Sequence, residues 1–153
     1  MAADASESAL PKAVLFACTA NTIRSPMAAA LIALHYGPIM RVETVGVRPG
    51  AEIDPLAAEV MDELGADLSR HRPKNFEALD EDAHFDLIVS LSPEAHHRAL
   101  EKVPGLAGAA EYWPTFDPSV TESSRAQRLD EYRLVRDGLA KRIEARFPRP
   151  STG

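Results

Sequence analysis

Short apolar runs alternate with helix-forming segments along this chain, which limits the folds it can adopt. Apolar runs occupy residues 13–18, 41–47, 85–91 and, more weakly, 109–113. Helical spacing of apolar residues follows these runs over about 26–36, 55–64, 93–103 and 125–147. Strands that alternate with helices form a parallel sheet covered on both faces, so we predict a three-layer α/β fold. Ligands of such sheets bind just beyond the carboxyl ends of the strands.

The length of 153 residues fits a single domain, which we assign to residues 11–148. Residues 1–10 are small and acidic and are expected to be disordered, and residues 149–153 are expected to form a loose tail. The first ten residues lack the basic start and long apolar stretch of a secretory signal. No apolar run approaches the ~20 residues of a membrane-spanning helix. The sequence therefore predicts a cytoplasmic protein with no membrane partner.

The charge and the cysteine count exclude several kinds of site. Seventeen basic residues against 23 acidic ones give a net charge of −6, which argues against a nucleic-acid partner. An anionic ligand must then be held by a local arrangement of donors. The single cysteine excludes an internal disulfide, and no Cys/His cluster has the spacing of a structural zinc site. We therefore expect no metal and no other cofactor.

The segment that follows the first strand has the features of an anion-binding loop. Cys18 lies at the strand end, and Arg24 lies six residues later at the start of a helix. Backbone N–H groups of a tight loop, the positive end of the helix and the planar Arg24 guanidinium can converge on one phosphate. Ser25 can cap the helix and also donate to the sulfur. We predict that phosphate is bound by Thr19, Ala20, Asn21, Thr22, Ile23, Arg24 and Ser25.

A lone cysteine in an apolar run is usually a small buried residue. The joint spacing of cysteine, five residues, arginine and Ser-Pro at a strand-to-helix transition instead favours a nucleophile. The segment CTANTIRSP resembles the nucleophile loop of the low-molecular-weight protein tyrosine phosphatases, which normally reads like CxGNxCRSP. The resemblance extends from about residue 13 to 147, through TVGVRPG, DLSRHRPK, FDLIVSLS and the Asp-Pro pair of WPTFDPS.

The resemblance implies a four-stranded parallel sheet with a phosphate-binding loop after the first strand and a phosphocysteine intermediate. It makes Cys18 the nucleophile, Arg24 the ligand of the phosphoryl group and Asp117 the general acid. It also implies that Asn21 holds the loop in shape and that Ser25 hydrogen-bonds the sulfur. Chemistry requires such an acid, because the leaving group must be protonated as its bond to phosphorus breaks. Glu111 is the next candidate if Asp117 does not serve.

Several positions depart from the family pattern. Ala20 replaces a glycine, and its methyl group would be strained by roughly 1 kcal/mol if the backbone there needed positive φ. Ile23 replaces the second cysteine, so oxidised Cys18 would depend on an external thiol for rescue. Ser119 stands in the segment where tyrosine-specific members place aromatic walls, which leaves tyrosine specificity open. Thr22 indicates a different pocket, like that of bacterial members that act on phosphoarginine.

The sequence thus predicts a cysteine-dependent phosphatase, a monomer or weak dimer, that acts on a phosphorylated protein or a small phosphate ester. Phosphotyrosine or a related phosphoresidue is the expected target, and Tyr112, Trp113 or Phe116 is a candidate for the wall of its pocket. An arsenate reductase that uses an external small thiol is an alternative, because one cysteine cannot support an internal relay. A non-catalytic phosphate-binding module is another.

Other polar residues are expected to lie on solvated surfaces. His96 and His97 are adjacent on a predicted helix, point about 100° apart and cannot jointly hold a metal. His71 belongs to a small basic cluster for which a solvated face is also expected, with contact to an anionic substrate as the alternative. The other members of that cluster are Arg70, Arg72 and Lys74.

Overall fold

A four-stranded parallel sheet forms the centre of the molecule. The structure is a computed structural model and describes residues 10–106 and 108–149. The strands are β1 (Ala13–Cys18), β2 (Arg41–Gly46), β3 (Leu87–Ser90) and β4 (Ala109–Tyr112), in the order β2-β1-β3-β4. All three neighbouring pairs are parallel, with Cys18 opposite Gly46 and Ala17 opposite Ser90. The predicted α/β sheet is confirmed, and the carboxyl ends of its strands meet at one edge.

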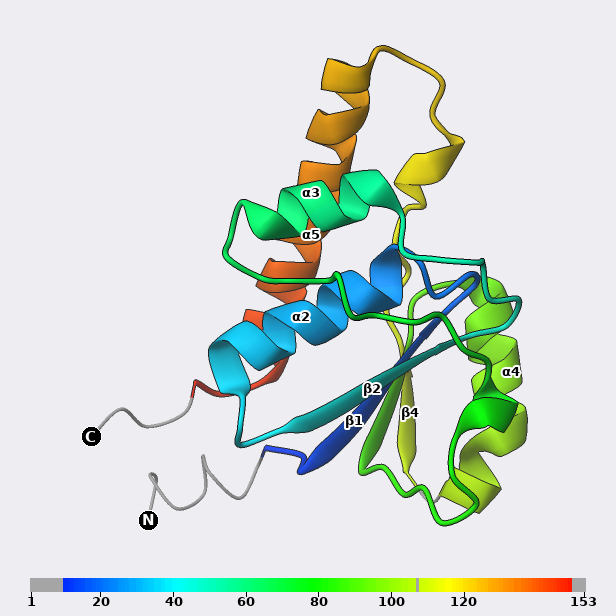
Figure 1. The fold of residues 1–153 in the computed structure, drawn as a ribbon. Helices are drawn as coiled ribbons and strands as arrows, with labels where there is room; N and C mark the ends of the chain where they lie inside the picture. Colours follow the sequence, from blue (N-terminus) through cyan, green and yellow to red (C-terminus); the bar gives the residue numbers. More distant parts are fainter. Residues whose placement is uncertain (1–9, 107, 150–153) are drawn as a thin grey trace.

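Helices cover both faces of this sheet (Figure 1). On one face lie α2 (Arg24–Tyr36), α3 (Pro55–Asp62) and α5 (Arg125–Arg146), and on the other lies α4 (Pro93–Leu106). Two short 3-10 turns, η1 (Phe76–Ala78) and η2 (Pro118–Val120), lie in the connections. No helix within the described ranges is long and apolar enough to cross a membrane.

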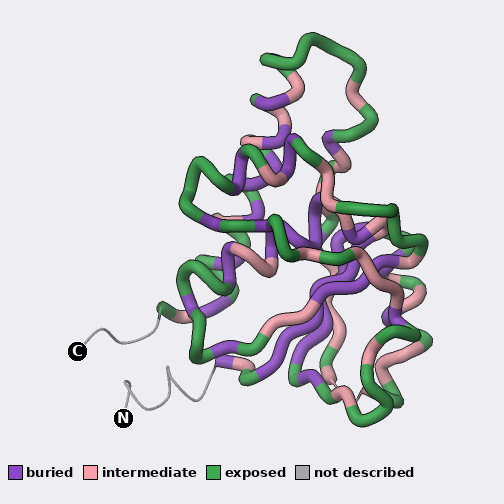
Figure 2. The backbone as a smooth tube through the Cα atoms, in the orientation of Figure 1, coloured by how far each residue is buried: buried purple, intermediate pink, exposed green. Residues whose placement is uncertain are grey.

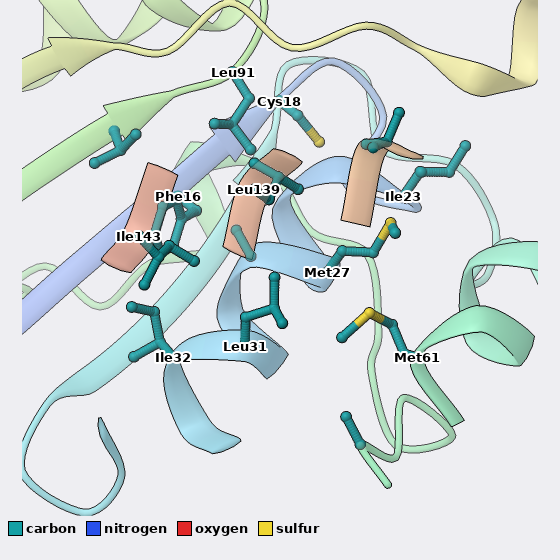
Figure 3. Close-up of a cluster of buried hydrophobic side chains, with 14 of the residues drawn as sticks. Phe16, Cys18, Ile23, Met27, Leu31, Ile32, Met61, Leu91, Leu139 and Ile143 are labelled. Atoms are coloured by element: carbon teal, nitrogen blue, oxygen red, sulfur yellow. The ribbon is translucent and has the colours of Figure 1, made fainter. Parts of the chain in front are cut away.

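The alternation of side chains along β1 divides the core into two parts. Val14 and Phe16 pack with α2, α3 and α5, whereas Leu15 and Ala17 pack with α4. Figure 2 shows the resulting continuous buried zone through the sheet. Figure 3 shows side chains of β1 and α2 packed together with Leu139 of α5. The six apolar residues that predicted the last helix are all buried: Leu129, Tyr132, Val135, Leu139, Ile143 and Phe147.

Helix boundaries follow local capping chemistry. Asp54 Oδ1 accepts hydrogen bonds from the amides of Leu56 and Ala57 and so begins α3. Ser92 Oγ accepts from the amide of Ala95 at 3.2 Å and so caps the start of α4. One expectation is wrong: α3 ends at Asp62, so Leu64 lies beyond the helix and is 39% exposed rather than buried.

The predicted chain ends are described only in part. Leu10 is 7% exposed and joins the core, although we had grouped it with the disordered start. The other residues of that segment, 1–9, and residues 150–153 of the predicted tail lie outside the described residues.

Candidate active site

The segment between β1 and α2, residues 19–23, curls around the end of β1; we call it the Cys18 loop. Cys18 Sγ lies 2.9 Å from Ser25 Oγ and accepts a hydrogen bond from the amide of Asn21 at 3.2 Å. Ser25 Oγ accepts from Asn21 Nδ2 at 2.8 Å, which leaves the serine proton free to point at the sulfur. Two donors therefore face the sulfur, an arrangement suited to an anionic thiolate.

Carbonyl groups of this loop are all turned outward. The oxygens of Cys18, Thr19, Ala20 and Thr22 accept from the amides of Val47, Arg48, Gly50 and Asp54, respectively, at 2.8 to 3.1 Å. Asn21 O accepts from His71 Nε2 at 2.7 Å, and Ile23 O accepts from the amide of Met27. Residues outside the loop thus bind all its carbonyls, whereas the N–H groups of Thr19, Ala20, Thr22 and Ile23 have no acceptor within the described residues and can bind an anion. The segment after β2, residues 47–54, thus holds the anion-binding loop in shape, a role that the sequence did not predict.

Asn21 fixes the sharpest part of the loop. It is fully buried and has φ of 57°, in the left-handed region that asparagine tolerates better than most residues. Its Oδ1 accepts from the amide of Lys74 at 2.9 Å, while its Nδ2 reaches Ser25. These contacts are the ones that the predicted loop-holding role requires. Among the described non-glycine residues only Asn21 has positive φ, so the strain considered for Ala20 does not arise.

Gly46 allows the end of β2 to approach the loop. A Cβ at this position would lie 2.8 Å from Asn21 N and 2.9 Å from Ala20 C, both backbone atoms. Distances this short do not occur for a real Cβ, so a side chain would push the two segments apart. Glycine is therefore required here by close backbone approach rather than by an unusual φ.

A cavity of about 60 Å³ lies inside the loop. Its lining consists of Cys18, Thr19, Ala20, Thr22, Ile23, Arg24, Asp117 and Ser119. Helix α2 begins at Arg24, and its N-cap residue, Ile23, supplies no side-chain acceptor. The expectation that Ser25 caps this helix is therefore wrong, because Ser25 already lies inside the helix and faces the sulfur. The uncapped end of α2 opens toward a space suited to a tetrahedral oxyanion.

Arg24 and Asp117 meet at the mouth of this cavity. Arg24 is 8% exposed, and its Nη1 donates to Thr115 O at 3.0 Å. Its Nη2 lies 3.9 Å from Asp117 Oδ2. The other carboxylate oxygen, Asp117 Oδ1, accepts from the amide and the hydroxyl of Ser119 at 2.9 and 2.7 Å. The three residues predicted to be catalytic, from two distant segments, therefore line one cavity.

Glu111, the second candidate for the acid, has a different environment. It lies in β4 and accepts hydrogen bonds from Arg146 and from Trp113 Nε1. The bond from Arg146 is the main reason that the pKa of Glu111 is lowered. A carboxyl group kept ionised in this way is a poor proton donor, and Glu111 does not line the cavity.

Two of the polar residues expected on solvated faces instead have structural contacts. His71 is half-buried against Asn21 O, and burial lowers the pKa of its imidazole. Because a carbonyl oxygen can only accept, Nε2 is the donor in this hydrogen bond. His96 stacks on Tyr112 with ring centroids 4.8 Å apart and bonds Ser90 Oγ through Nδ1 at 2.9 Å. His97 is exposed, as expected. Across the described residues no group of three or more His, Cys, Asp or Glu is placed to hold a metal.

The three aromatic residues considered as pocket walls differ in burial and in contacts. Trp113 is 2% exposed and packs against Phe16 and Phe147, and Tyr112 stacks on His96. Phe116 is the most exposed of the three, at 57%. The burial of Trp113 therefore excludes it as a wall, and His96 occupies one face of Tyr112.

Comparison with known proteins agrees with this geometry. The sequence pattern of the family described as low molecular weight phosphotyrosine protein phosphatase matches residues 13–145. The chain belongs to this family. A protein-arginine-phosphatase of Geobacillus stearothermophilus is 31% identical over 148 residues, covering 88% of this chain and 98% of the relative. An arsenate reductase of Bacillus licheniformis is 27% identical over 135 residues, covering 87% and 93%.

Solved structures of the family share the fold. The tyrosine phosphatase AmsI of Erwinia amylovora superposes with a TM-score of 0.71 at 20% identity, covering 90% of this chain and 91% of that one. An arginine phosphatase of Geobacillus stearothermophilus gives a TM-score of 0.67 at 26% identity, covering 88% and 89%. Members of the family are thus named tyrosine phosphatase, arginine phosphatase and arsenate reductase, and the fold alone does not choose among these activities.

Proposed function

We propose that this chain is a cysteine-dependent phosphatase that hydrolyses a phosphorylated protein residue or a small phosphate ester in the cytoplasm. The observation that carries the proposal is the 60 Å³ cavity that Cys18, Arg24 and Asp117 line together. Its cradle of inward amides and its buried guanidinium suit the three non-bridging oxygens of a phosphoryl group. The sulfur lies at the floor of that cradle, where it can attack phosphorus.

The reaction would proceed in two steps. Cys18 Sγ attacks phosphorus and forms an S–P bond while the P–O or P–N bond to the leaving group breaks and Asp117 protonates the departing atom. The Asp117 carboxylate then takes a proton from water, whose oxygen attacks phosphorus, and the S–P bonding pair returns to sulfur. Arg24 holds the equatorial oxygens in both steps, and Ser25 donates to the sulfur when it leaves as thiolate.

Polar groups at the mouth favour a non-aromatic phosphoresidue. Thr22 and Ser119 line the cavity, and Val120 follows Ser119 where aromatic walls would serve a phenyl ring. A relative that is 31% identical is named a protein-arginine-phosphatase. Phosphoarginine is therefore the first substrate to test, and phosphotyrosine, for which exposed Phe116 would be the wall, is the second.

Arsenate reduction is the second candidate activity, because several relatives, including one that is 27% identical, are named arsenate reductase. Arsenate would occupy the same cradle as phosphate. Reduction of arsenate needs two electrons, and with one cysteine in the chain the second thiol must come from a small molecule such as glutathione.

One experiment separates these functions. Purified protein is assayed side by side against phosphoarginine, phosphotyrosine, p-nitrophenyl phosphate and arsenate with added glutathione. We expect phosphate release that is lost in Cys18→Ser, although the serine variant still binds vanadate. Thiol-dependent arsenite formation without phosphate release would favour the reductase. Anion binding with no turnover of any substrate would leave only a binding module.

A further inference from the structure

The backbone that carries the candidate acid is held on both sides of Asp117. Before it, the amide of Thr115 donates to Leu91 O at 3.1 Å, and the carbonyl of Thr115 accepts from Arg24 Nη1 at 3.0 Å. After it, Pro118 is buried and begins η2, the short turn in the connection from β4 to α5 (Figure 1). The rotation of the Asp117 carboxyl group is therefore the main freedom that these contacts leave open.

Ser119 restricts this rotation. Its amide and its hydroxyl group both donate to the same carboxylate oxygen, Asp117 Oδ1, at 2.9 and 2.7 Å. The amide bond belongs to the cap of η2 and needs no particular side chain, whereas the hydroxyl bond depends on serine. The torsion of a carboxyl group about its Cβ–Cγ bond has only broad preferences. Two donors on one oxygen therefore hold the plane of the carboxyl group more firmly than the amide alone.

The two donors also distinguish the two oxygens of the acid. In a protonated carboxyl group one oxygen carries the proton and the other only accepts. Because Oδ1 accepts from both donors of Ser119, it takes the accepting role and the proton belongs on Oδ2. Oδ2 lies 3.9 Å from Arg24 Nη2, which is too long for a hydrogen bond, on the side of the carboxyl group that faces the guanidinium. The transferable proton is thereby placed next to the side chain that would hold the phosphoryl oxygens.

We propose that Ser119 is a positioning residue for the general acid, because its hydroxyl group holds Asp117 Oδ1 so that Oδ2 presents its proton to the leaving atom. This inference rests on the proposed phosphatase function. As the bond between phosphorus and the leaving atom breaks, the proton moves from Oδ2 to that atom, and the carboxylate keeps both hydrogen bonds from Ser119. Hydrogen bonds to an ionised acceptor are stronger than those to a neutral one, so the two bonds favour this proton transfer.

The alternative role for this hydroxyl group is contact with the substrate, because Ser119 lines the cavity. The two roles differ in what they affect. A hydroxyl group that positions the acid affects the protonation of the leaving atom, and it has no effect once the acid is removed. A hydroxyl group that binds the substrate affects binding whether or not the acid is present. The 2.7 Å bond to Asp117 Oδ1 uses the hydroxyl proton and so favours the positioning role.

Replacements of Ser119 test this role through kcat/KM, which includes the step that breaks the bond to the leaving atom. Ser119→Ala and Ser119→Val remove the hydroxyl group and should lower kcat/KM by about fivefold on phosphoarginine and phenyl phosphate, whose leaving atoms must be protonated. The loss on p-nitrophenyl phosphate should be less than about twofold, because nitrophenolate leaves without a proton. Ser119→Thr keeps the hydroxyl group and should recover most of the loss. Ser123→Ala is the control, because Ser123 is exposed in the same connection and does not line the cavity.

Removal of the acid separates the two roles. In the Asp117→Asn background, Ser119→Ala should cause no further loss of kcat/KM, because the proton to be positioned is absent. The inhibition constant of inorganic phosphate should stay within about twofold in each Ser119 variant, since anion binding does not involve the acid. No loss in Ser119→Ala, equal losses on all three substrates, a loss that persists in Asp117→Asn, a changed inhibition constant or no recovery with threonine would each overturn the inference and leave the phosphatase function intact. Release of phosphate from none of the three substrates by the unmodified protein would refute the proposed function, and the inference with it.

Discussion

Asn21 offers the sharpest test of how the Cys18 loop is held, because two separate physical effects meet at this residue. Its side chain donates to Ser25 Oγ and accepts from the amide of Lys74, at 2.8 and 2.9 Å, with no exposure to solvent. Its backbone has φ of 57°. Substitution by alanine removes both hydrogen bonds. It also places in the left-handed region a residue that tolerates this conformation less well than asparagine does. Substitution by glycine removes the same bonds but accepts that backbone freely.

These contacts set the expected change in the free energy of unfolding for each variant. Each lost hydrogen bond between buried groups costs about 1 kcal/mol in the free energy of unfolding. The left-handed conformation costs alanine about 1 kcal/mol more than glycine. We therefore expect Asn21→Ala to destabilise the protein by about 3 kcal/mol and Asn21→Gly by about 2 kcal/mol. Both variants should also lose turnover, because the amide of residue 21 would no longer be fixed toward Cys18 Sγ.

Urea unfolding followed by circular dichroism measures both variants against the unmodified protein, with the slope of the transition as a check on two-state behaviour. Alanine and glycine variants of equal stability would refute the backbone part of the reasoning. Two variants within about 0.5 kcal/mol of the unmodified protein would refute the hydrogen-bond part.

Three further outcomes are expected. Gly46→Ala should destabilise the fold and lower kcat, because its Cβ meets backbone atoms at 2.8 and 2.9 Å; normal activity of this variant would contradict the close approach. Hydrogen bonds from Arg133 and Arg136 lower the pKa of Glu63 from 4.5 to about 2, so the stability that they provide is present above pH 4.5 and is lost as pH falls toward 2. Glu63→Gln should therefore show a smaller drop in urea midpoint across that range, and an unchanged drop would refute the assignment. Asp117→Asn should slow phosphoarginine hydrolysis more than p-nitrophenyl phosphate hydrolysis, because the nitrophenolate leaves without a proton; equal losses on both substrates would contradict the acid role.

Sequence periodicity predicted the elements well because the signals of strand and helix are local. The boundaries of β1 and the start of α5 agree with the predicted ones. The six apolar residues that predicted this helix, from Leu129 to Phe147, are buried, and Phe147 lies just beyond its end. The end of α3 differs by two residues, because Leu64 continues the apolar spacing whereas the helix stops at Asp62; the chain then turns at Gly65, which has φ of 80° and which the sequence suggests as the stop. Periodicity carries no information about where a helix stops if the next apolar residue still fits the pattern.

Some parts of the candidate site could be predicted from the sequence, and others could not. Side chains with distinctive chemistry, such as Cys18 and Arg24, are visible in the sequence. The donors that orient the loop are backbone amides of residues 47–54, and amides carry no side-chain signature. Gly46, just before them, was the available signal, because an interior glycine marks a close backbone approach. Ser25 was misassigned as a cap because its position before Pro26 suggested a later helix start.

The most direct test of the central claim is to identify the atom that carries the phosphoryl group during turnover. Asp117→Asn is mixed with phosphoarginine or p-nitrophenyl phosphate, denatured within seconds, digested and examined by mass spectrometry. Because this variant lacks the base that activates water, we predict a phosphoryl group on the peptide that contains Cys18 and, in Cys18→Ser with Asp117→Asn, no phosphorylated peptide. A phosphoryl group on any other residue, or product release at an undiminished rate from Cys18→Ser, would contradict attack by the Cys18 sulfur.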